Sequence, residues 1–295
     1  MTPKGTILII GGAEDKGAGV KSAMDEKNKN FEHFEILKEL LPERGKTQAA
    51  IEIIATASSM PDEMNSMYKK AIKKAGYNKV GFIKISDREG ARNLEYCDRI
   101  LKAHAVMFTG GDQFMLSAML AGTPVVDCIK DKLYGDPDFV VAGTSAGAMA
   151  LSKIMIYEDG VEEALLKTDL RITSGLGIFD TCIIDTHFIQ RGRFGRLVNA
   201  IIMNPESLGI GLGEDTALII KKGTEAECRG SGSTIIIDGI EIGQTNIAQA
   251  DDHTSIFVEN LRVHILANSC RFSIKDRRMA QPAVSPVRSK ALKNR

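Results

Sequence analysis

The first half of the chain alternates short apolar runs with segments long enough to form a helix. The runs lack polar alternation, which is typical of strands buried on both faces. They cover residues 6–10, 50–55, 80–85, 105–109 and 139–142. Apolar residues recur at helical spacing over residues 31–41, 61–75, 93–103 and 114–121. This alternation predicts an α/β fold, a mainly parallel sheet with helices on both faces.

The predicted strands follow one another more closely after about residue 175. They cover residues 177–179, 182–185, 217–220, 234–237 and 255–258. We interpret them as antiparallel additions to the same sheet toward the C-terminus. No segment between these strands has the composition of a linker. We therefore predict one α/β domain over residues 1–272.

The last residues differ in composition from the rest. From Lys275 onward, seven basic residues accompany one acidic residue, with little apolar periodicity. Such a segment buries too little apolar surface to fold by itself. Residues 273–295 are therefore predicted to form a basic, disordered tail; a docking arm for an acidic partner is the alternative.

Charge and cysteine content exclude several classes of protein. Lys plus Arg and Asp plus Glu both number 38, so no overall charge draws the chain to nucleic acid or to a membrane. No run approaches 18 apolar residues, the length of a membrane span. The cysteines are odd in number and form no CxxC pair, which predicts reduced thiols in a cytoplasmic protein. They are Cys97, Cys128, Cys182, Cys228 and Cys270.

Glycine-bearing turns follow several of the predicted strands, at residues 11–12, 110–111, 143 and 147. In open α/β sheets, ligands bind outside the carboxyl ends of the strands. We therefore expect these turns to share one rim of the sheet. Ser145 lies between Gly143 and Gly147, so the same argument places its hydroxyl on that rim.

The segment Gly143–Gly147 has the form G-x-S-x-G. This spacing is typical of a nucleophile elbow, in which a serine on a tight strand-to-helix turn projects its Oγ, and the next amide, here that of Ala146, faces the oxyanion. The alternative is a glycine-rich turn that only permits close packing. The buried strand before Ser145 and the small residues after it favour the elbow.

A nucleophilic serine needs a base and a carboxylate that orients the base. His187 is the best-placed of the five histidines, because it follows the apolar run 182–185 and precedes an arginine cluster; a structural histidine is the alternative. Glu214 and Asp215 lie in a glycine-lined turn before a strand. Either of these two residues can be the orienting carboxylate. The alternative is that both lie in a solvated turn and have no catalytic role.

Arg191, Arg193 and Arg196 begin a predicted helix just after His187. Guanidinium groups at a helix N-terminus favour an anion site. A salt-bridged surface helix is the alternative. No aromatic platform accompanies the arginines, so a nucleic-acid surface is disfavoured.

Five segments together resemble the cyanophycinase family. These serine exopeptidases are related to aspartyl dipeptidase (peptidase E) and share the class I glutamine-amidotransferase-like, flavodoxin-like fold. The segments appear in family order between about residues 5 and 220. They are GGAEDK at 11–16, GGDQ at 110–113, GTSAGA at 143–148, DTHFIQRGRFGRL at 185–197 and GEDTAL at 213–218.

The resemblance implies a Ser-His-Glu triad of Ser145, His187 and Glu214. It also implies substrate-binding positions at Gln113, Asp185, Arg191, Arg193 and Arg196. The substrate would be cyanophycin, a polyaspartate with arginine on each β-carboxyl, and the product the β-Asp-Arg dipeptide. The resemblance implies a homodimer and implies neither a metal nor a cofactor.

Acyl transfer by a serine nucleophile also needs groups that hold the oxyanion and the substrate. The amide of Gly111 is expected to join that of Ala146 in holding the oxyanion. Acidic residues, either Asp185 or those at 158–163, are hypothesised to receive the substrate guanidinium. Thr186 departs from the family pattern, where glutamine occurs in some members.

Three other functions compete with this interpretation. An aspartyl dipeptidase would apply the same chemistry to α-linked Asp-X peptides. A glutamine amidotransferase-like domain normally has cysteine at the elbow, so the serine argues against it. A non-catalytic anion- or nucleotide-binding protein is disfavoured because the chain has no GxxxxGK[ST] phosphate loop.

Overall fold

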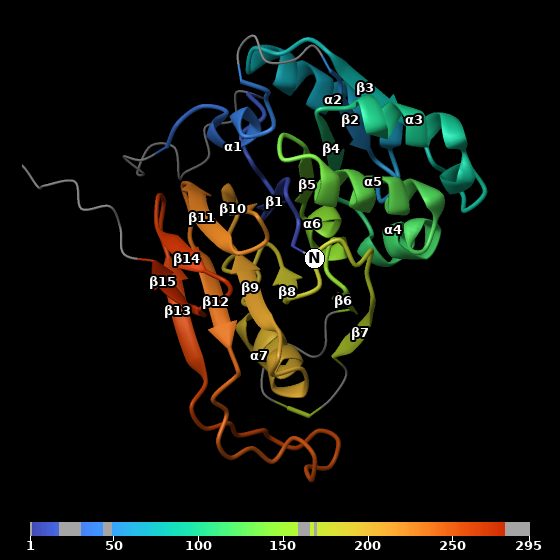
Figure 1. Ribbon diagram of the computed structural model, residues 1–295. Helices are drawn as coiled ribbons and strands as arrows, with labels where there is room; N and C mark the ends of the chain where they lie inside the picture. Colours follow the sequence, from blue (N-terminus) through green and yellow to red (C-terminus); the bar gives the residue numbers. More distant parts are fainter. Residues whose placement is uncertain (1, 18–30, 44–48, 159–165, 168–169, 281–295) are drawn as a thin grey trace, which may run out of the picture.

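The computed structural model describes residues 2–17, 31–43, 49–158, 166–167 and 170–280. Their strands form sheets of nine, four and two strands (Figure 1). The parallel half of the nine-stranded sheet has the order β1-β5-β4-β2-β3. These strands are β1 (Thr6–Ile10), β5 (Val140–Thr144), β4 (Ala105–Phe108), β2 (Ile51–Ile54) and β3 (Val80–Ile83).

The other half of this sheet is antiparallel. It extends from β1 through β10, β11 and β14 to β15. These strands are β10 (Thr216–Lys221), β11 (Glu225–Gly230), β14 (Arg271–Ser273) and β15 (Arg278–Ala280). The predicted antiparallel additions are therefore present.

Helices cover both faces of the parallel half, as predicted. Ile7 and Ile9 of β1 belong to a core cluster that also contains residues of the helices α3 and α5. Leu8 and Ile10 point to the opposite face, into a cluster that contains residues of α1 and α2. Successive side chains of a strand face opposite sides, so two apolar layers explain the lack of polar alternation. The helices are α1 (Glu35–Lys38), α2 (Pro61–Lys74), α3 (Leu94–Lys102), α4 (Gln113–Leu120) and α5 (Pro124–Gly135), with a 3-10 turn at Gly90–Arg92.

A four-stranded sheet of order β13-β12-β9-β8 was not predicted. Its strands are β8 (Cys182–Asp185), β9 (Leu208–Leu212), β12 (Thr234–Asp238) and β13 (Arg262–Leu266). β8 pairs in parallel with β9 through the crossover helix α7 (Phe194–Met203). The late strands thus divide between two sheets, because β8 pairs with β9 rather than with an edge strand of the first sheet.

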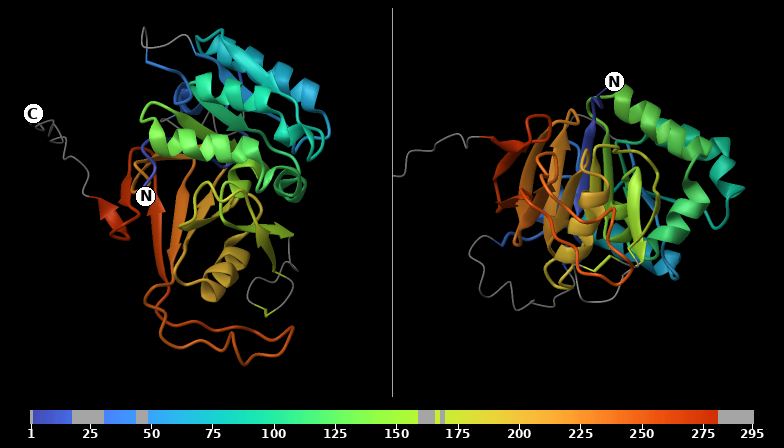
Figure 2. Two further views of the ribbon diagram at one scale, coloured as in Figure 1. Left: turned by 45° about the vertical axis from the view of Figure 1, so that its right-hand side comes forward. Right: turned by 90° about the horizontal axis from the view of Figure 1, so that it is seen from below.

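The two larger sheets share one core. The same cluster contains Val141 of β5, Ile184 of β8 and Ile237 of β12. Figure 2 shows the helices α2 and α3 at one end of the molecule and the second sheet with α7 at the other. The short helix α6 (Ala146–Ala150) and the hairpin β6 (Ile154–Glu158) and β7 (Arg171–Ser174) complete the described elements.

Several predicted elements differ from those observed. The helix expected over 31–41 is only Glu35–Lys38, because Phe34 has a left-handed backbone with φ 58°. Residues 177–179 and 255–258 are not strands and contribute only isolated bridges. The helix α5 was missed, although Pro124 stands at its first turn, where proline is favoured.

The predicted domain boundary at residue 272 falls inside the strand β14. Residues 271–280 form a hairpin at the edge of the nine-stranded sheet. Asp238 is fully buried and accepts hydrogen bonds from Arg262 Nη2 at 2.7 Å and Arg277 Nη1 at 2.6 Å. This ion pair fixes the hairpin turn to the second sheet. The rest of the predicted tail, residues 281–295, lies outside the described residues.

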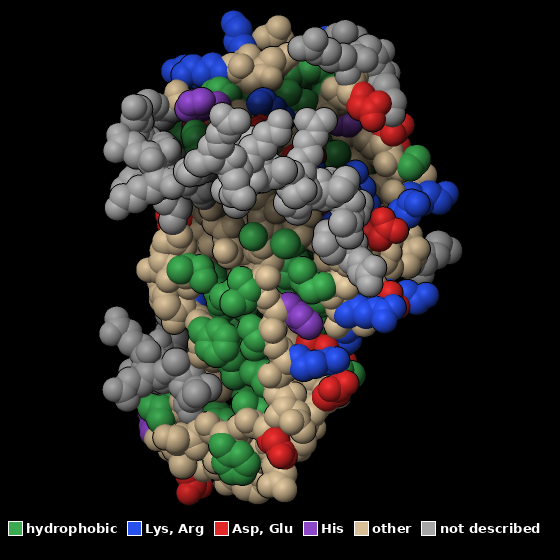
Figure 3. All heavy atoms as spheres, turned by 90° about the vertical axis from the view of Figure 1, so that its left-hand side faces the viewer, with side chains coloured by type: hydrophobic (Ala, Val, Ile, Leu, Met, Phe, Trp, Pro, Cys, Tyr) green, Lys and Arg blue, Asp and Glu red, His purple; other side chains and the backbone are tan. Residues whose placement is uncertain are grey.

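The side of the molecule that carries β11 to β15 has an apolar surface. Figure 3 faces this side and shows hydrophobic side chains gathered across its middle. Val263 and Ile265 of the edge strand β13 are exposed, as is Met279 of β15.

No helix in the described part of the chain is long and apolar enough to cross a bilayer.

We predict that Asp238→Asn lowers the free energy of unfolding by about 2–3 kcal/mol, because it removes a buried charge that two guanidinium groups contact. Asp62→Asn is the matched control, since it breaks an exposed pair with Lys84 and should cost at most about 1 kcal/mol. Urea denaturation of both variants measures the difference. Equal losses would contradict the importance of the Asp238 pair.

Candidate active site

Three consecutive carbonyl groups at the end of β1 hold the segments of the site together. Ile10 O accepts from Ser145 N at 3.0 Å, Gly11 O from His187 N at 2.9 Å, and Gly12 O from Asp215 N at 2.9 Å. The three donors lie far apart in the sequence. The turn after β1 therefore fixes where the segments around residues 145, 187 and 215 meet.

Ser145 lies on a tight turn between β5 and α6, as the G-x-S-x-G spacing predicts. Its backbone has φ 52° and ψ −122°, a sparsely populated conformation that typically costs about 1–3 kcal/mol. A Cβ on Gly147 would lie 2.4 Å from Phe108 O, and one on Gly143 would lie 2.5 Å from Gly147 O. The two flanking glycines are therefore required by close backbone packing around the serine.

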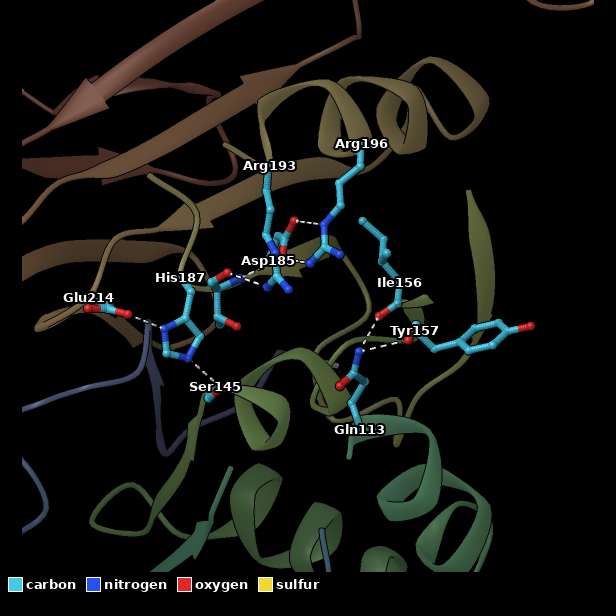
Figure 4. A network of polar contacts seen from close by, with 10 residues as sticks. Gln113, Ser145, Ile156, Tyr157, Asp185, His187, Arg193, Arg196 and Glu214 are labelled. Atoms are coloured by element: carbon cyan, nitrogen blue, oxygen red, sulfur yellow. Dashed lines mark hydrogen bonds and ion pairs between the residues drawn. The ribbon is translucent and has the colours of Figure 1, made fainter. Parts of the chain in front are cut away.

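The Ser145 hydroxyl and the His187 imidazole are in hydrogen-bond contact. The distance from Ser145 Oγ to His187 Nε2 is 2.9 Å, and that from His187 Nδ1 to Glu214 Oε1 is 2.7 Å. Figure 4 shows the imidazole between the serine and the glutamate. In this arrangement Nδ1–H donates to the carboxylate, which leaves Nε2 to accept from the hydroxyl.

Glu214, rather than Asp215, contacts the imidazole. The Asp215 carboxylate faces another way and accepts from Ser231 Oγ at 2.5 Å and from Asp15 N at 3.2 Å. Burial raises the pKa of Asp215 above its ordinary value, against the opposing effect of the Ser231 hydrogen bond. The two adjacent acids, which their spacing alone did not separate, thus have different surroundings.

The serine, histidine and glutamate come from two sheets rather than from one rim. Ser145 follows β5 of the nine-stranded sheet, and His187 follows β8 of the four-stranded sheet. Glu214 lies in the turn from β9 to β10, where the chain passes from the second sheet to the first. The glycine turns after β1, β4 and β5 do share one rim of the first sheet, as expected, and His187 approaches it from the second sheet because β8 pairs with β9.

Two amides expected at the oxyanion lie beside the serine. A Cβ on Gly110 would lie 3.7 Å from Ser145 Oγ, which places the 110–111 turn next to the nucleophile. Gly111 has φ 142°, and a Cβ there would lie 1.9 Å from Ala57 O. Neither the Gly111 nor the Ala146 amide donates to a backbone carbonyl of the described residues. In this geometry the N–H groups of Gly111 and Ala146 can both donate to a ligand.

Gln113 begins α4 and fixes the neighbouring strand β6. Its Nε2 donates to Tyr157 O at 3.1 Å and to Ile156 O at 3.4 Å (Figure 4). The Phe114 ring, half exposed, packs 5.1 Å from the Tyr157 ring. Sequence reasoning missed this aromatic pair, because no strand was predicted between residues 142 and 177.

Asp185 is fully buried and pairs with two of the three arginines. Arg196 Nε donates to Oδ2 at 2.6 Å and its Nη2 donates to Oδ1. Arg193 Nη1 lies 3.4 Å from Oδ1 and donates to Thr186 O at 2.7 Å. Burial raises the pKa of Asp185 to about 7 and lowers that of Arg196 to about 10. Their mutual contact offsets only part of the two desolvation costs.

This pairing changes the expected roles of the charged residues. Because Asp185 has no exposed surface, the hypothesis that it receives a substrate guanidinium does not fit its surroundings. Of the acids at 158–163, residues 159–163 lie outside the described residues. Arg191 is exposed, so it differs from the two largely buried arginines. Figure 4 shows Arg193 and Arg196 on either side of Asp185.

Thr186 lies between Asp185 and His187 and is buried. Its amide donates to Asp185 Oδ1 at 2.8 Å. Its hydroxyl has no hydrogen-bond partner among the described residues. The side chain therefore packs inside the protein, and its backbone links the arginine cluster to the histidine.

The imidazole fits against a glycine. Gly12 has φ +96°, and a Cβ there would lie 2.5 Å from both Nε2 and Cε1 of His187. The sequence predicted a glycine turn at this position but gave no sign of its contact with the histidine. Within the described residues, no cluster of three or more potential metal ligands was found.

The fold and the hydrogen-bonded serine, histidine and glutamate are typical of an α/β serine hydrolase. Residues 21–227 match the model of peptidase family S51. The chain is 31% identical over 283 residues to the cyanophycinase of Synechococcus elongatus, covering 96% of this chain and 83% of that protein. It is 33% identical over 291 residues to the cyanophycinase of Trichormus variabilis, covering 98% and 92%.

The chain therefore belongs to peptidase family S51 and is a serine peptidase. A solved structure of a peptidase from an acI-B1 actinobacterium superposes with a TM-score of 0.63 at 21% identity. The match covers 91% of this chain and 96% of that one. It agrees with the α/β fold predicted from the strand pattern.

We predict that Gly12→Ala lowers kcat/KM by about 10²-fold or more, because the new methyl group displaces the imidazole. Gly76→Ala is the matched control: Gly76 also has positive φ, at +110°, but nothing lies within 4 Å of its Cβ position. Peptidase assays and thermal melting of both variants separate the steric effect from backbone strain. Equal kcat/KM in the two variants would contradict the assigned contact.

Proposed function

We propose that this peptidase hydrolyses cyanophycin and releases β-Asp-Arg dipeptides through Ser145, His187 and Glu214. The observation that carries the proposal is the continuous hydrogen-bonded chain from Ser145 Oγ through His187 to Glu214. The near full-length similarity to two cyanophycinases supports the choice of substrate.

In the proposed reaction, His187 Nε2 takes the hydroxyl proton as Ser145 Oγ attacks the scissile carbonyl. Glu214 holds the imidazole in the tautomer that leaves Nε2 free to accept, and stabilises the imidazolium that forms. The imidazolium then gives its proton to the leaving amine. Water hydrolyses the resulting acyl-enzyme, with His187 acting again as base.

The amides of Ala146 and Gly111 are proposed to hold the oxyanion. Ala146 begins α6, so its amide has no carbonyl to bond within that helix. Gly110 lies against Ser145, and Gly111 is the next residue of the same turn. Loss of one such donor typically lowers kcat by about 10²–10³-fold.

The three arginines are proposed to have two different roles. Arg193 and Arg196 are largely buried and share the Asp185 carboxylate, so they supply net positive charge close to the histidine segment. Arg191 is exposed, and its amide donates to His187 O at 3.0 Å. It is therefore the arginine best placed to meet a substrate carboxylate from solvent.

The nearest alternative is an aspartyl dipeptidase, which would use the same triad on α-linked Asp-X peptides. Hydrolysis of Asp-Leu without hydrolysis of cyanophycin would favour it. A non-catalytic anion-binding protein is disfavoured by the triad geometry, since the hydrogen-bonded order of serine, imidazole and carboxylate is typical of a nucleophile and its base.

We predict that Ser145→Ala abolishes release of soluble β-Asp-Arg from insoluble cyanophycin, because it removes the attacking oxygen. Mass spectrometry of the supernatant identifies the product. Ser66→Ala, at an exposed position of α2, should keep full activity. Release of the dipeptide by the Ser145 variant would refute the proposed nucleophile.

We predict that Arg191→Ala raises KM for β-Asp-Arg oligomers by about five- to twentyfold, as expected for loss of one partly screened charge contact. KM for isopeptides without free carboxylates should change less than twofold. Added salt should weaken oligomer binding by the wild type more than by the variant. An equal change for both substrates would contradict the carboxylate contact.

A further inference from the structure

Glu14 is a buried acid that the proposed reaction does not use. It belongs to the GGAEDK segment, directly after the turn that holds Ser145, His187 and Asp215. Its side chain has no exposed surface. A buried carboxylate is costly unless it is paired and hydrogen-bonded, so its contacts indicate what it is kept for.

Both carboxylate oxygens of Glu14 are engaged. Tyr68 Oη donates to Oε1 at 2.5 Å, and Lys16 Nζ lies 3.1 Å from the same oxygen. Thr144 Oγ1 donates to Oε2 at 2.8 Å. Burial alone would raise the pKa of Glu14, but the Lys16 ammonium and these hydrogen bonds outweigh it and leave the pKa below its ordinary value. The group is therefore an ionised acceptor.

One of these contacts reaches the nucleophile turn. Thr144 is the last residue of β5 and is paired in register with Ile10 of β1. The next residue is Ser145, whose backbone is in a sparsely populated conformation. Such a conformation persists only where the surroundings determine it strongly. The bond from the Thr144 hydroxyl to Glu14 fixes the side chain immediately before the strained residue.

The neighbouring residue makes the corresponding contact at the acidic turn. Asp15 N donates to Asp215 Oδ1, and Asp215 directly follows Glu214. Residues 14 and 15 thus hold the chain next to two members of the triad, one on each side. The glycine turn at 11–12 fixes the backbones, and residues 14–15 fix the adjoining side chains.

We propose that Glu14 is a positioning residue for the nucleophile, acting through Thr144 on the turn that aims the Ser145 hydroxyl at His187. The proposal rests on the proposed function of Ser145. Its main consequence is that removing the Thr144 hydroxyl should slow the chemical step while leaving substrate binding almost unchanged.

The test compares two substitutions of Thr144. Thr144→Val keeps the shape of the side chain but cannot donate to Glu14, and we expect kcat to fall about ten- to hundredfold with KM within twofold. Thr144→Ser restores the donor and should keep kcat within about threefold of the wild type. Equal kcat in the valine and serine variants would overturn the proposal.

Tyr68→Phe is the control for a purely structural role. It removes the hydrogen bond to Glu14 Oε1 but leaves the bond from Thr144 Oγ1 to Glu14 Oε2 in place, and kcat should stay within about threefold of the wild type. Thermal melting is measured for all variants. If Tyr68→Phe lowered kcat as much as Thr144→Val, the effect would be one of stability, and the proposal would be wrong.

A second readout does not depend on the substrate. The rate at which diisopropyl fluorophosphate labels Ser145 should fall in Thr144→Val and recover in Thr144→Ser. If the wild type is labelled but does not cleave cyanophycin, the proposed substrate fails while the role of Glu14 is still tested. If valine and serine variants are labelled equally fast, the role of Glu14 fails and the proposed function stands. A wild type that is neither labelled nor active on cyanophycin would refute both.

Discussion

The site depends on the three carbonyl groups at the carboxyl end of β1. Each accepts the amide of a different segment, at Ser145, His187 and Asp215. A backbone hydrogen bond has a narrow range of length and angle, so these bonds set the relative positions of the segments before any side chain acts. Buried, water-excluded amides are also costly to leave unpaired. The turn after β1 therefore couples the stability of the sheet to the geometry of the triad.

The convergence of two sheets explains the rest of the arrangement. The first sheet supplies the nucleophile turn, and the second supplies the histidine and the arginines that follow it. The chain crosses between the sheets at residues 213–215, and Glu214 lies at this crossing. Asp185 ends β8 and is enclosed by Arg193 and Arg196. This buried pair anchors the start of α7 to the strand that carries the histidine, and so orients the loop between them.

The sequence predicted the parts of the fold that depend on local pattern. Apolar runs such as Thr6–Ile10 and the glycines around Ser145 have one compatible structure, because burial on both faces and close backbone approach each leave a clear signal. Pairing of distant strands leaves none. Nothing in Cys182–Asp185 distinguishes an edge of the first sheet from a partner of β9, so the second sheet could not be predicted.

The sequence predicted the residues of the site but not the contacts between them. These residues were named from spacing and resemblance, but their contacts depend on geometry. Asp185 was one of the acids hypothesised to receive a substrate guanidinium, whereas the fold encloses it between two arginines of the same chain. The contact of Gly12 with the imidazole and that of Glu14 with Thr144 also depend on long-range convergence. A motif identifies which residues meet, and only the fold determines which atoms face one another.

The most direct test of the central claim is the location of a serine-directed label. The protein is treated with diisopropyl fluorophosphate, digested and analysed by peptide mass spectrometry. If the hydrogen-bonded chain from Ser145 to Glu214 activates one hydroxyl, the label is found on Ser145 alone, and His187→Ala removes it. Labelling of another serine, or undiminished labelling of Ser145 in the histidine variant, would contradict the account.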